Sequence, residues 1–260
     1  MATEFDLDLL GGPRALSSLI DIVTDAGEEA LRLQRGIGVL KKEDESPVTA
    51  ADQEVERRLR AHIDATWPEA AILGEEGGAK SGTKMRFIID PIDGTRAFIR
   101  GLPTWSVLLA MEWEGELALA VALMPTDGDL FVARAGGGAS MNGRPCRVSN
   151  VDTMGDALVG VGGAGQFTDS GRGPALLKIA ETAYSTRSFA DFANYRALLQ
   201  GRMDGVVDPG IKCWDIAPAA LLVSEAGGHW TDFEGGRDLH AGGFVASNGK
   251  IHDGLLATLE

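Results

Sequence analysis

The chain has 260 residues, of which 44% are hydrophobic, so it can bury the core of one large domain or two closely joined lobes. Its formal net charge of −14 argues against general electrostatic attraction to nucleic acid or to an anionic membrane. The two cysteines form no CxxC motif, which argues against a disulfide scaffold. The N-terminal segment is acidic, unlike a signal peptide, and the longest apolar run, residues 117–124, is too short to span a membrane. These features predict a cytoplasmic protein.

Two amphipathic helices are predicted near the start of the chain. Residues 13–35 carry apolar side chains near helical spacing. A second helix follows Thr49, which we expect to be its N-cap, with Asp52 in the first turn. The segment AAILGEEGG then predicts a short strand that ends in two carboxylates and glycine.

Strands dominate the middle of the chain. Phe87 to Ile89 read as a buried strand that Pro91 is expected to break. The segments WSVLLAMEW, ELALAVALM and DLFVARA also predict strands, and Asn142-Gly143 predicts a tight turn. We therefore expect a first lobe over residues 1–150.

A second lobe, over residues 151–260, alternates strand-like and helix-like segments. Helices are predicted at Ala175 to Thr182 and Phe192 to Gln200. A third helix is predicted to begin with Asp215 as N-cap and Pro218 in its first turn, and to end before Gly227 and Gly228.

The segment IIDPIDGTRAF, residues 88–98, carries the clearest chemical signal. Its strand places Asp90 at a carboxyl edge, and Asp93 follows three residues later. Gly94 and Thr95 then open a short helix whose backbone N–H groups suit phosphate oxygens. Mg²⁺ prefers a few carboxylates together with substrate phosphate oxygens. The alternative is an ordinary Pro-Asp-Gly turn with exposed acids.

Two further acidic segments argue against that alternative. Glu75 and Glu76 stand side by side between glycines, where like charges repel unless a cation lies nearby. Asp215 precedes a long apolar helix, although a helix cap alone would explain an aspartate there. Together these segments predict a carboxylate cluster that holds metal ions.

The segments GEE, DPIDGT and WDIAPAALLVSEAGG, in this order, resemble the inositol monophosphatase family. The similarity extends to SPVTAADQEVE before them and NGRP between them, and so covers nearly the whole chain. It implies an α/β fold, a layered αβαβα sandwich of the inositol monophosphatase and fructose bisphosphatase type. It also implies metal-dependent hydrolysis of a phosphate monoester on a small metabolite, and a homodimer.

The resemblance also implies roles for individual residues. Two or three Mg²⁺ ions would be bound by Glu75, Asp90, the backbone carbonyl of Ile92, Asp93 and Asp215. Asp52 and Thr95, with Glu75, would orient and deprotonate the attacking water. The amides of Gly94 and Thr95 would hold phosphate, and Glu76 would act through the water shell.

The substrate is predicted from two aspartates in the second lobe. Asp191 and Tyr195 resemble the Gly-Asp-x-x-x-Tyr pattern of the histidinol-phosphate phosphatase branch, although Ala190 replaces the glycine. A carboxylate at this place would pair with the substrate ammonium. Asp208 stands where inositol enzymes carry a substrate-binding glutamate. Histidinol phosphate is therefore the predicted substrate, and inositol 1-phosphate is the alternative.

Three other interpretations are weaker. A nucleotide 3′-phosphatase or a sugar bisphosphatase of the wider superfamily is usually longer than this chain. A non-catalytic binding protein would be indicated by loss of a metal carboxylate, yet all the expected ones are present. The GxGxxG pattern at residues 160–165 lacks the features of a dinucleotide site, because the residues after it read as loop.

Overall fold

The computed structural model describes residues 4–34, 39–41 and 47–259. Its contacts divide the chain into two compact units, Met1–Gly137 (unit 1) and Gly138–Glu260 (unit 2), whereas a boundary at residue 150 was expected. Both units combine helices with strands, which confirms the predicted α/β class. None of the helices in the described residues is long and apolar enough to cross a membrane.

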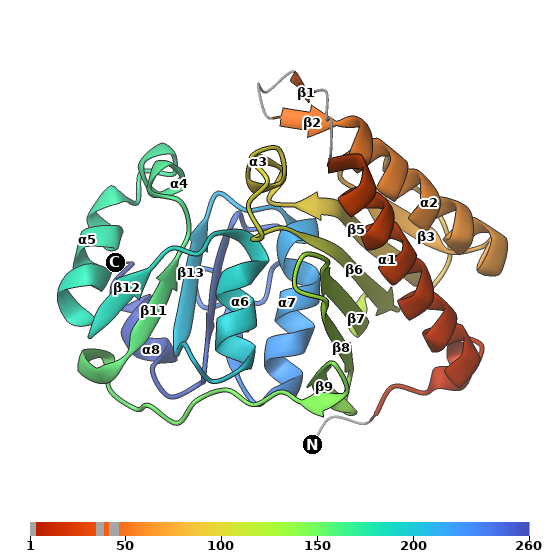
Figure 1. Cartoon of the computed structure of the whole chain (residues 1–260). Coiled ribbons are helices and arrows are strands. Elements are labelled where there is room, and N and C mark those ends of the chain that lie inside the picture. The colour runs from red at the N-terminus through yellow and green to blue at the C-terminus, as the bar shows by residue number, and fades with distance from the viewer. Residues whose placement is uncertain (1–3, 35–38, 42–46, 260) are drawn as a thin grey trace. The chain divides into compact units, whose positions relative to one another are not determined.

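Unit 1 is a twisted sheet covered by two long helices, α1 (Pro13–Gln34) and α2 (Ala50–Thr66), which pack against each other in Figure 1. Within the unit the strands run in the order β8-β7-β6-β5-β3-β4, and only the β3–β5 pair is parallel. Their bounds are β3 (Ala71–Gly74), β4 (Gly78–Lys80), β5 (Met85–Asp93), β6 (Ser106–Trp113), β7 (Glu116–Met124) and β8 (Asp129–Arg134). The shorter elements are η1 (Leu7–Leu9), β1 (Val39–Lys41), β2 (Pro47–Thr49) and α3 (Thr95–Phe98).

The core of unit 1 lies between the two helices and the sheet. Both predicted helices are confirmed, and their apolar stripes face the core, where Val23 on α1 and Leu59 on α2 are fully buried. Phe87 and Ile89 of β5 face the same core. This packing fixes α2 against β5, and thereby positions the first turn of α2 near the carboxyl end of that strand.

The expected break at Pro91 is wrong, because β5 continues through it to Asp93. Asp90 pairs with Leu108 and Asp93 with Ser106, so an advance of three residues along β5 is matched by only two residues along β6. The extra residue is a β-bulge, which accommodates a proline that has no N–H to donate to the neighbouring strand. Both aspartates therefore belong to one bulged strand end.

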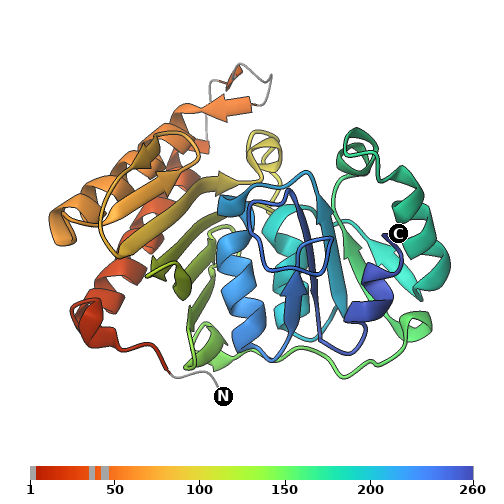
Figure 2. The ribbon, with the colours of Figure 1, turned by 180° about the vertical axis from the view of Figure 1, so that it is seen from behind.

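Unit 2 contains a five-stranded sheet in the order β12-β11-β13-β15-β14 (Figure 1; Figure 2 shows it from behind). Its elements are β9 (Gly138–Met141), β10 (Arg144–Pro145), η2 (Met154–Asp156), β11 (Leu158–Val161), α4 (Ala164–Asp169), α5 (Gly173–Thr182), β12 (Ser185–Arg187), α6 (Asp191–Leu199), β13 (Gly205–Pro209), α7 (Cys213–Glu225), β14 (His229–Thr231), β15 (Gly243–Ser247) and α8 (His252–Leu256). Helices α4, α5 and α8 share a core with one face of the sheet, and α6 and α7 pack together on the other.

Most predicted elements of unit 2 are confirmed, including the helices near residues 175–182 and 192–200. The expected turn joins β9 to β10, with positive φ at Asn142 (51°) and Gly143 (74°). The loop expected after residue 165 is wrong, because α4 spans Ala164–Asp169. This helix begins directly after the glycine pair Gly162-Gly163.

The start of α7 also differs from the prediction. The helix begins at Cys213, so Lys212 is its N-cap and Asp215 is the third residue of the first turn. Asp215 Oδ2 accepts the backbone N–H of Lys212 at 2.8 Å, which satisfies a donor that the helix itself cannot use. Pro218 consequently lies in the second turn, inside the helix. Gly227 follows the end of α7 with a φ of 86°, as a C-terminal glycine should.

Candidate active site

Glu75, Asp90 and Asp93 lie at one edge of the sheet in unit 1. Gly74 at the end of β3 pairs in parallel with Ile89, and the Glu75 N–H donates to the Ile89 carbonyl at 3.2 Å. Glu75, directly after β3, and Asp90, near the end of β5, therefore lie at the carboxyl ends of neighbouring parallel strands. Both aspartates are buried, and Ser106 Oγ donates to Asp93 Oδ2 at 2.8 Å.

The turn after β5 brings Thr95 to α2. Gly94 adopts a left-handed φ of 83° and caps α3, which confirms the predicted short helix and explains the glycine. Thr95 Oγ1 lies 3.3 Å from Asp52 Oδ1 and 3.1 Å from the Ile92 carbonyl oxygen, and donates toward both. The structure thus brings Asp52 to the turn that contains Ile92 and Thr95, although Asp52 and Thr95 are 43 residues apart in the sequence.

Asp52 is fully buried in the first turn of α2. Its Oδ2 accepts the Thr49 N–H at 2.8 Å and the Thr49 hydroxyl at 2.6 Å, which confirms the predicted capping box. Burial raises the pKa of the Asp52 carboxyl, the bonds from Thr49 lower it, and the nearby Glu75 charge raises it again. Asp52 and Glu75 are therefore close enough for their charges to interact.

The donors at this edge are hard oxygen atoms, namely carboxylates and the Ile92 carbonyl, which is the chemistry that magnesium prefers. Asp90 and Asp93 are buried, and a cation bound beside them would offset the cost of burying negative charge. In the portion of the chain that is described, no three His, Cys, Asp or Glu side chains already converge as a metal-binding group. The residues fit magnesium by donor type and by sharing one sheet edge.

The other predicted site residues lie in unit 2. Asp208, at the end of β13, is 4% exposed and accepts a hydrogen bond from the Tyr195 hydroxyl. Burial raises the pKa of Asp208 to about 7; the Tyr195 bond lowers it, and the charges of Asp191 and Asp215 raise it further. Asp208 therefore interacts electrostatically with both Asp191 and Asp215, and we call these three residues the unit 2 acidic group.

Asp191 does not occupy the helix N-cap. That position belongs to Ala190, with φ 66° and ψ 157°, and Asp191 is the first residue of α6, with φ 49°. Positive φ at two consecutive residues other than glycine is uncommon and costs conformational energy. The capping explanation for Asp191 is therefore not supported by the position of α6.

Two residues that support these acids, Ser106 and Glu56, were not predicted from the sequence. Ser106 has no local signal, because it reaches Asp93 only through the pairing of β5 with β6. For Glu56 the sequence does carry a signal, because this charged residue lies on the buried stripe of α2, between Val55 and Leu59. It is 2% exposed and bonds to the loop that carries Glu75 and Glu76.

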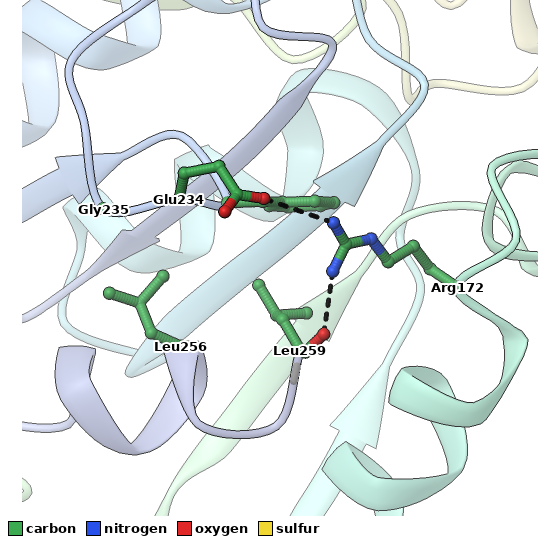
Figure 3. A pocket seen from close by; sticks show the side chains of 6 residues that line it. Arg172, Glu234, Gly235, Leu256 and Leu259 are labelled. Atoms are coloured by element: carbon green, nitrogen blue, oxygen red, sulfur yellow. Dashed lines mark hydrogen bonds and ion pairs between the residues drawn. The ribbon is translucent and has the colours of Figure 1, made fainter.

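A cavity of about 380 Å³ lies elsewhere in unit 2 (Figure 3). Its Arg172 donates to the Leu259 carbonyl at 2.8 Å, lies 3.6 Å from Glu234 and covers the ring of Phe233. The remaining lining residues are Gly235 and Leu256. No predicted site residue lines it, so this cavity is separate from the residues of the predicted site.

Comparison with known proteins agrees with this geometry. The family model described as "Inositol monophosphatase family" matches residues 15–260. A histidinol-phosphatase of Streptomyces coelicolor is 34% identical and covers 97% of each chain, and an inositol-1-monophosphatase of Rhizobium meliloti is 34% identical and covers 82% of each. The crystal structure of the extragenic suppressor protein suhB from Bartonella henselae superposes with a TM-score of 0.87 at 28% identity, covering 95% of this chain and 98% of that one. The chain therefore belongs to the inositol monophosphatase family and is a phosphatase.

Proposed function

We propose that the chain is a magnesium-dependent histidinol-phosphate phosphatase, which converts L-histidinol phosphate and water into histidinol and phosphate. The observation that carries the choice of substrate is the unit 2 acidic group, in which Asp208 interacts electrostatically with Asp191 and with Asp215. Three carboxylates near one another are costly without a cation. Histidinol phosphate brings an ammonium group, whereas inositol 1-phosphate brings only hydroxyls.

Asp191 is the residue we assign to this ammonium. It is half-buried at the start of α6, held there by a backbone with positive φ. An ammonium paired with a carboxylate forms a charge-assisted hydrogen bond, which is stronger than one between neutral groups. The similarity to a histidinol-phosphatase over 97% of this chain supports the same choice.

We assign hydrolysis to the predicted site residues of unit 1, together with Asp215 of unit 2. Members of this family generally depend on magnesium, and two or three ions held by Glu75, Asp90, the Ile92 carbonyl, Asp93 and Asp215 would lower the pKa of water and neutralise phosphate charge. The Thr95 hydroxyl donates toward Asp52, which leaves its lone pairs able to accept a hydrogen bond from the attacking water. Asp52, with Glu75, would take the proton that this water loses.

We further assign phosphate binding to the turn that follows β5. The amides of Gly94 and Thr95 open α3, and the left-handed conformation of Gly94 lets the backbone approach a phosphate closely. Glu76 would act on the water shell from the loop after β3. Its own N–H is engaged by Glu56, which holds this loop at the edge of the sheet.

Inositol 1-phosphate is the second candidate, because the chain is equally identical to an inositol-1-monophosphatase. In that case Asp208 would contact a substrate hydroxyl. The carboxylate of Asp208 is, however, 4% exposed and already accepts a bond from Tyr195. This favours a supporting role for Asp208 and leaves the ammonium to Asp191.

The test is phosphate release by the purified protein with Mg²⁺ on histidinol phosphate and inositol 1-phosphate in parallel. We expect a strong preference for histidinol phosphate, and we expect Asp191→Asn to lower kcat/KM for it by about 10- to 100-fold, the value of one charge-assisted contact. Asp253→Asn is the matched control, because it removes an acid from the first turn of another helix, α8. It should leave kcat/KM for histidinol phosphate unchanged. Preference for inositol 1-phosphate in the wild type, with no effect of Asp191→Asn, would reject this substrate.

A further inference from the structure

A partly buried ion pair on α2, between Glu56 and Arg60, holds the loop that carries Glu75 and Glu76. Glu56 is 2% exposed and lies one helical turn after Asp52. Its Oε2 accepts the Glu76 N–H at 2.8 Å, and its Oε1 accepts the Gly77 N–H at 2.9 Å and Arg60 Nε at 2.6 Å. Both oxygens of one carboxylate are thus engaged, and two of the three donors are backbone groups of the loop.

Arg60 closes the arrangement from the other side. Its guanidinium bonds to Glu56 and also donates to the Gly78 carbonyl. The loop is therefore held at three consecutive residues, Glu76, Gly77 and Gly78, by two side chains from one turn of α2. Because charge-assisted bonds are strong and the Glu56 carboxylate that receives most of them is buried, they fix the position of the loop against the helix.

The glycines of the loop are explained by the same ion pair. A Cβ on Gly74 would lie 2.1 Å from Glu56 Oε1, and a Cβ on Gly77 would lie 2.7 Å from Arg60 Nε. A side chain at either position would displace the pair. The Gly-Glu-Glu-Gly segment therefore combines two carboxylates with two glycines that allow the loop to lie directly on Glu56 and Arg60.

We propose that Glu56, supported by Arg60, is a positioning residue that sets the location of Glu75 for magnesium binding. This inference rests on the proposed function, because it takes Glu75 as a magnesium ligand. One helix then aligns two parts of the site: Asp52 accepts from Thr95, and Glu56 a turn later holds the loop of Glu75. Residues that orient metal ligands typically contribute 10- to 100-fold to metal affinity.

The most direct variant is Glu56→Gln, which keeps the shape of the side chain and replaces one acceptor oxygen with an NH₂ donor. That group would face a backbone N–H or the Arg60 guanidinium, so at least one bond to the loop is lost. We expect the dissociation constant for Mn²⁺, measured by electron paramagnetic resonance of the free ion without substrate, to rise by about 10- to 100-fold. Phosphatase activity should recover as the Mg²⁺ concentration is raised, which a purely structural defect would not allow.

The matched control is Glu54→Gln. Glu54 lies on the same helix and pairs with Arg57 and Arg58, but these bonds do not reach the loop. Glu54→Gln should therefore leave the dissociation constant for Mn²⁺ unchanged. Arg60→Gln is the second variant, to be used if Glu56→Gln does not fold, and it should weaken Mn²⁺ binding in the same direction by a smaller factor.

The outcomes separate the two proposals. If the wild type binds Mn²⁺ and releases phosphate while the folded Glu56→Gln or Arg60→Gln protein binds Mn²⁺ as tightly, the positioning role is rejected and the proposed function stands. If the wild type itself neither binds Mn²⁺ nor releases phosphate, the proposed function fails, and the positioning role fails with it. Weaker binding in the variants, with Glu54→Gln unchanged, supports the positioning role.

Discussion

Single residues in this protein are held by neighbours that are distant in the sequence. Asp93 at the end of β5 accepts the hydroxyl of Ser106, and Asp52 accepts the hydroxyl of Thr95, 43 residues away, in addition to that of the nearby Thr49. Each bond occupies one oxygen of a buried carboxylate and restricts its rotation. Ala190, in contrast, has a strained backbone, because its φ of 66° and ψ of 157° are disfavoured by its own Cβ.

Replacing Ala190 by glycine should stabilise the protein. At φ 66° and ψ 157° the Cβ of alanine costs roughly 1 to 3 kcal/mol, whereas glycine adopts this region freely. The greater entropy of glycine in the unfolded chain offsets about 0.4 to 1 kcal/mol of that gain. We therefore expect Ala190→Gly to raise the free energy of unfolding by about 1 kcal/mol, measured by urea denaturation.

Ala197→Gly is the control for this substitution. Ala197 lies in the interior of α6, where glycine typically destabilises a helix by about 1 kcal/mol. The two variants should consequently shift the unfolding midpoint in opposite directions. Destabilisation by both would show that the backbone at Ala190 is not strained.

At the scale of elements, His252 joins α8 to two strands of the unit 2 sheet. Its Nε2 lies 3.0 Å from Thr231 Oγ1 of β14, and its Nδ1 lies 2.9 Å from Ser247 Oγ of β15. Burial lowers the pKa of His252 to about 4, and repulsion from His229 adds to this effect. The neutral imidazole is therefore the form that packs between these elements.

This predicts an acid-dependent loss of stability. The ordinary histidine pKa is near 6.5, so the unfolded chain takes up a proton first as the pH falls. The contribution of His252 is present above pH 6.5 and is lost progressively as the pH falls toward about 4. Between pH 7 and pH 5 this amounts to about 2 kcal/mol of unfolding free energy.

His252→Gln removes the titrating group and should be less stable than the wild type at pH 7 but less sensitive to acid. Comparing urea denaturation at pH 7 and pH 5 measures the difference. His240→Gln, at an exposed loop position, serves as the control and should keep the full pH dependence of the wild type. If the stability of His252→Gln fell between pH 7 and pH 5 as much as that of the wild type, His252 would not be the group responsible for the acid-dependent loss.

Much of the fold was predictable from the sequence, because apolar patterns locate α1, α2 and five strands of unit 1, namely β3, β5, β6, β7 and β8. Two errors show where local patterns fail. Pro91 does not end β5, since its effect depends on how the neighbouring strand pairs. Asp215 is not the N-cap of α7, because the helix begins earlier, at Cys213. The contact of Glu56 with the Glu75 loop depends on tertiary packing, and no local pattern gives its partner.

At the scale of the whole molecule, the net charge of −14 adds electrostatic repulsion at every acidic group of the site. Self-repulsion in such a chain makes each buried carboxylate more costly. Asp90 and Asp93 are buried at the same strand end, with Glu75 beside them. A divalent cation bound there relieves repulsion that is present only in the folded chain. The homodimer implied by the family resemblance stays a prediction.

Magnesium should therefore stabilise the folded protein. A ligand that binds only the folded state raises the free energy of unfolding by about 1.4 kcal/mol at ten times its dissociation constant. We expect a higher melting temperature in MgCl₂ than in NaCl of equal ionic strength, measured by scanning calorimetry. Asp93→Asn removes one carboxylate, but an amide at this position still accepts from Ser106, so the fold should survive.

The same variant separates a specific site from general screening of the acidic surface. Screening acts on the whole charge of the molecule, and Asp93→Asn changes that charge by only one unit. If magnesium binds at the end of β5, this substitution should abolish both the magnesium-dependent rise in melting temperature and phosphate release. If the rise persists in Asp93→Asn, the stabilisation comes from the surface, and Asp93 is not a ligand.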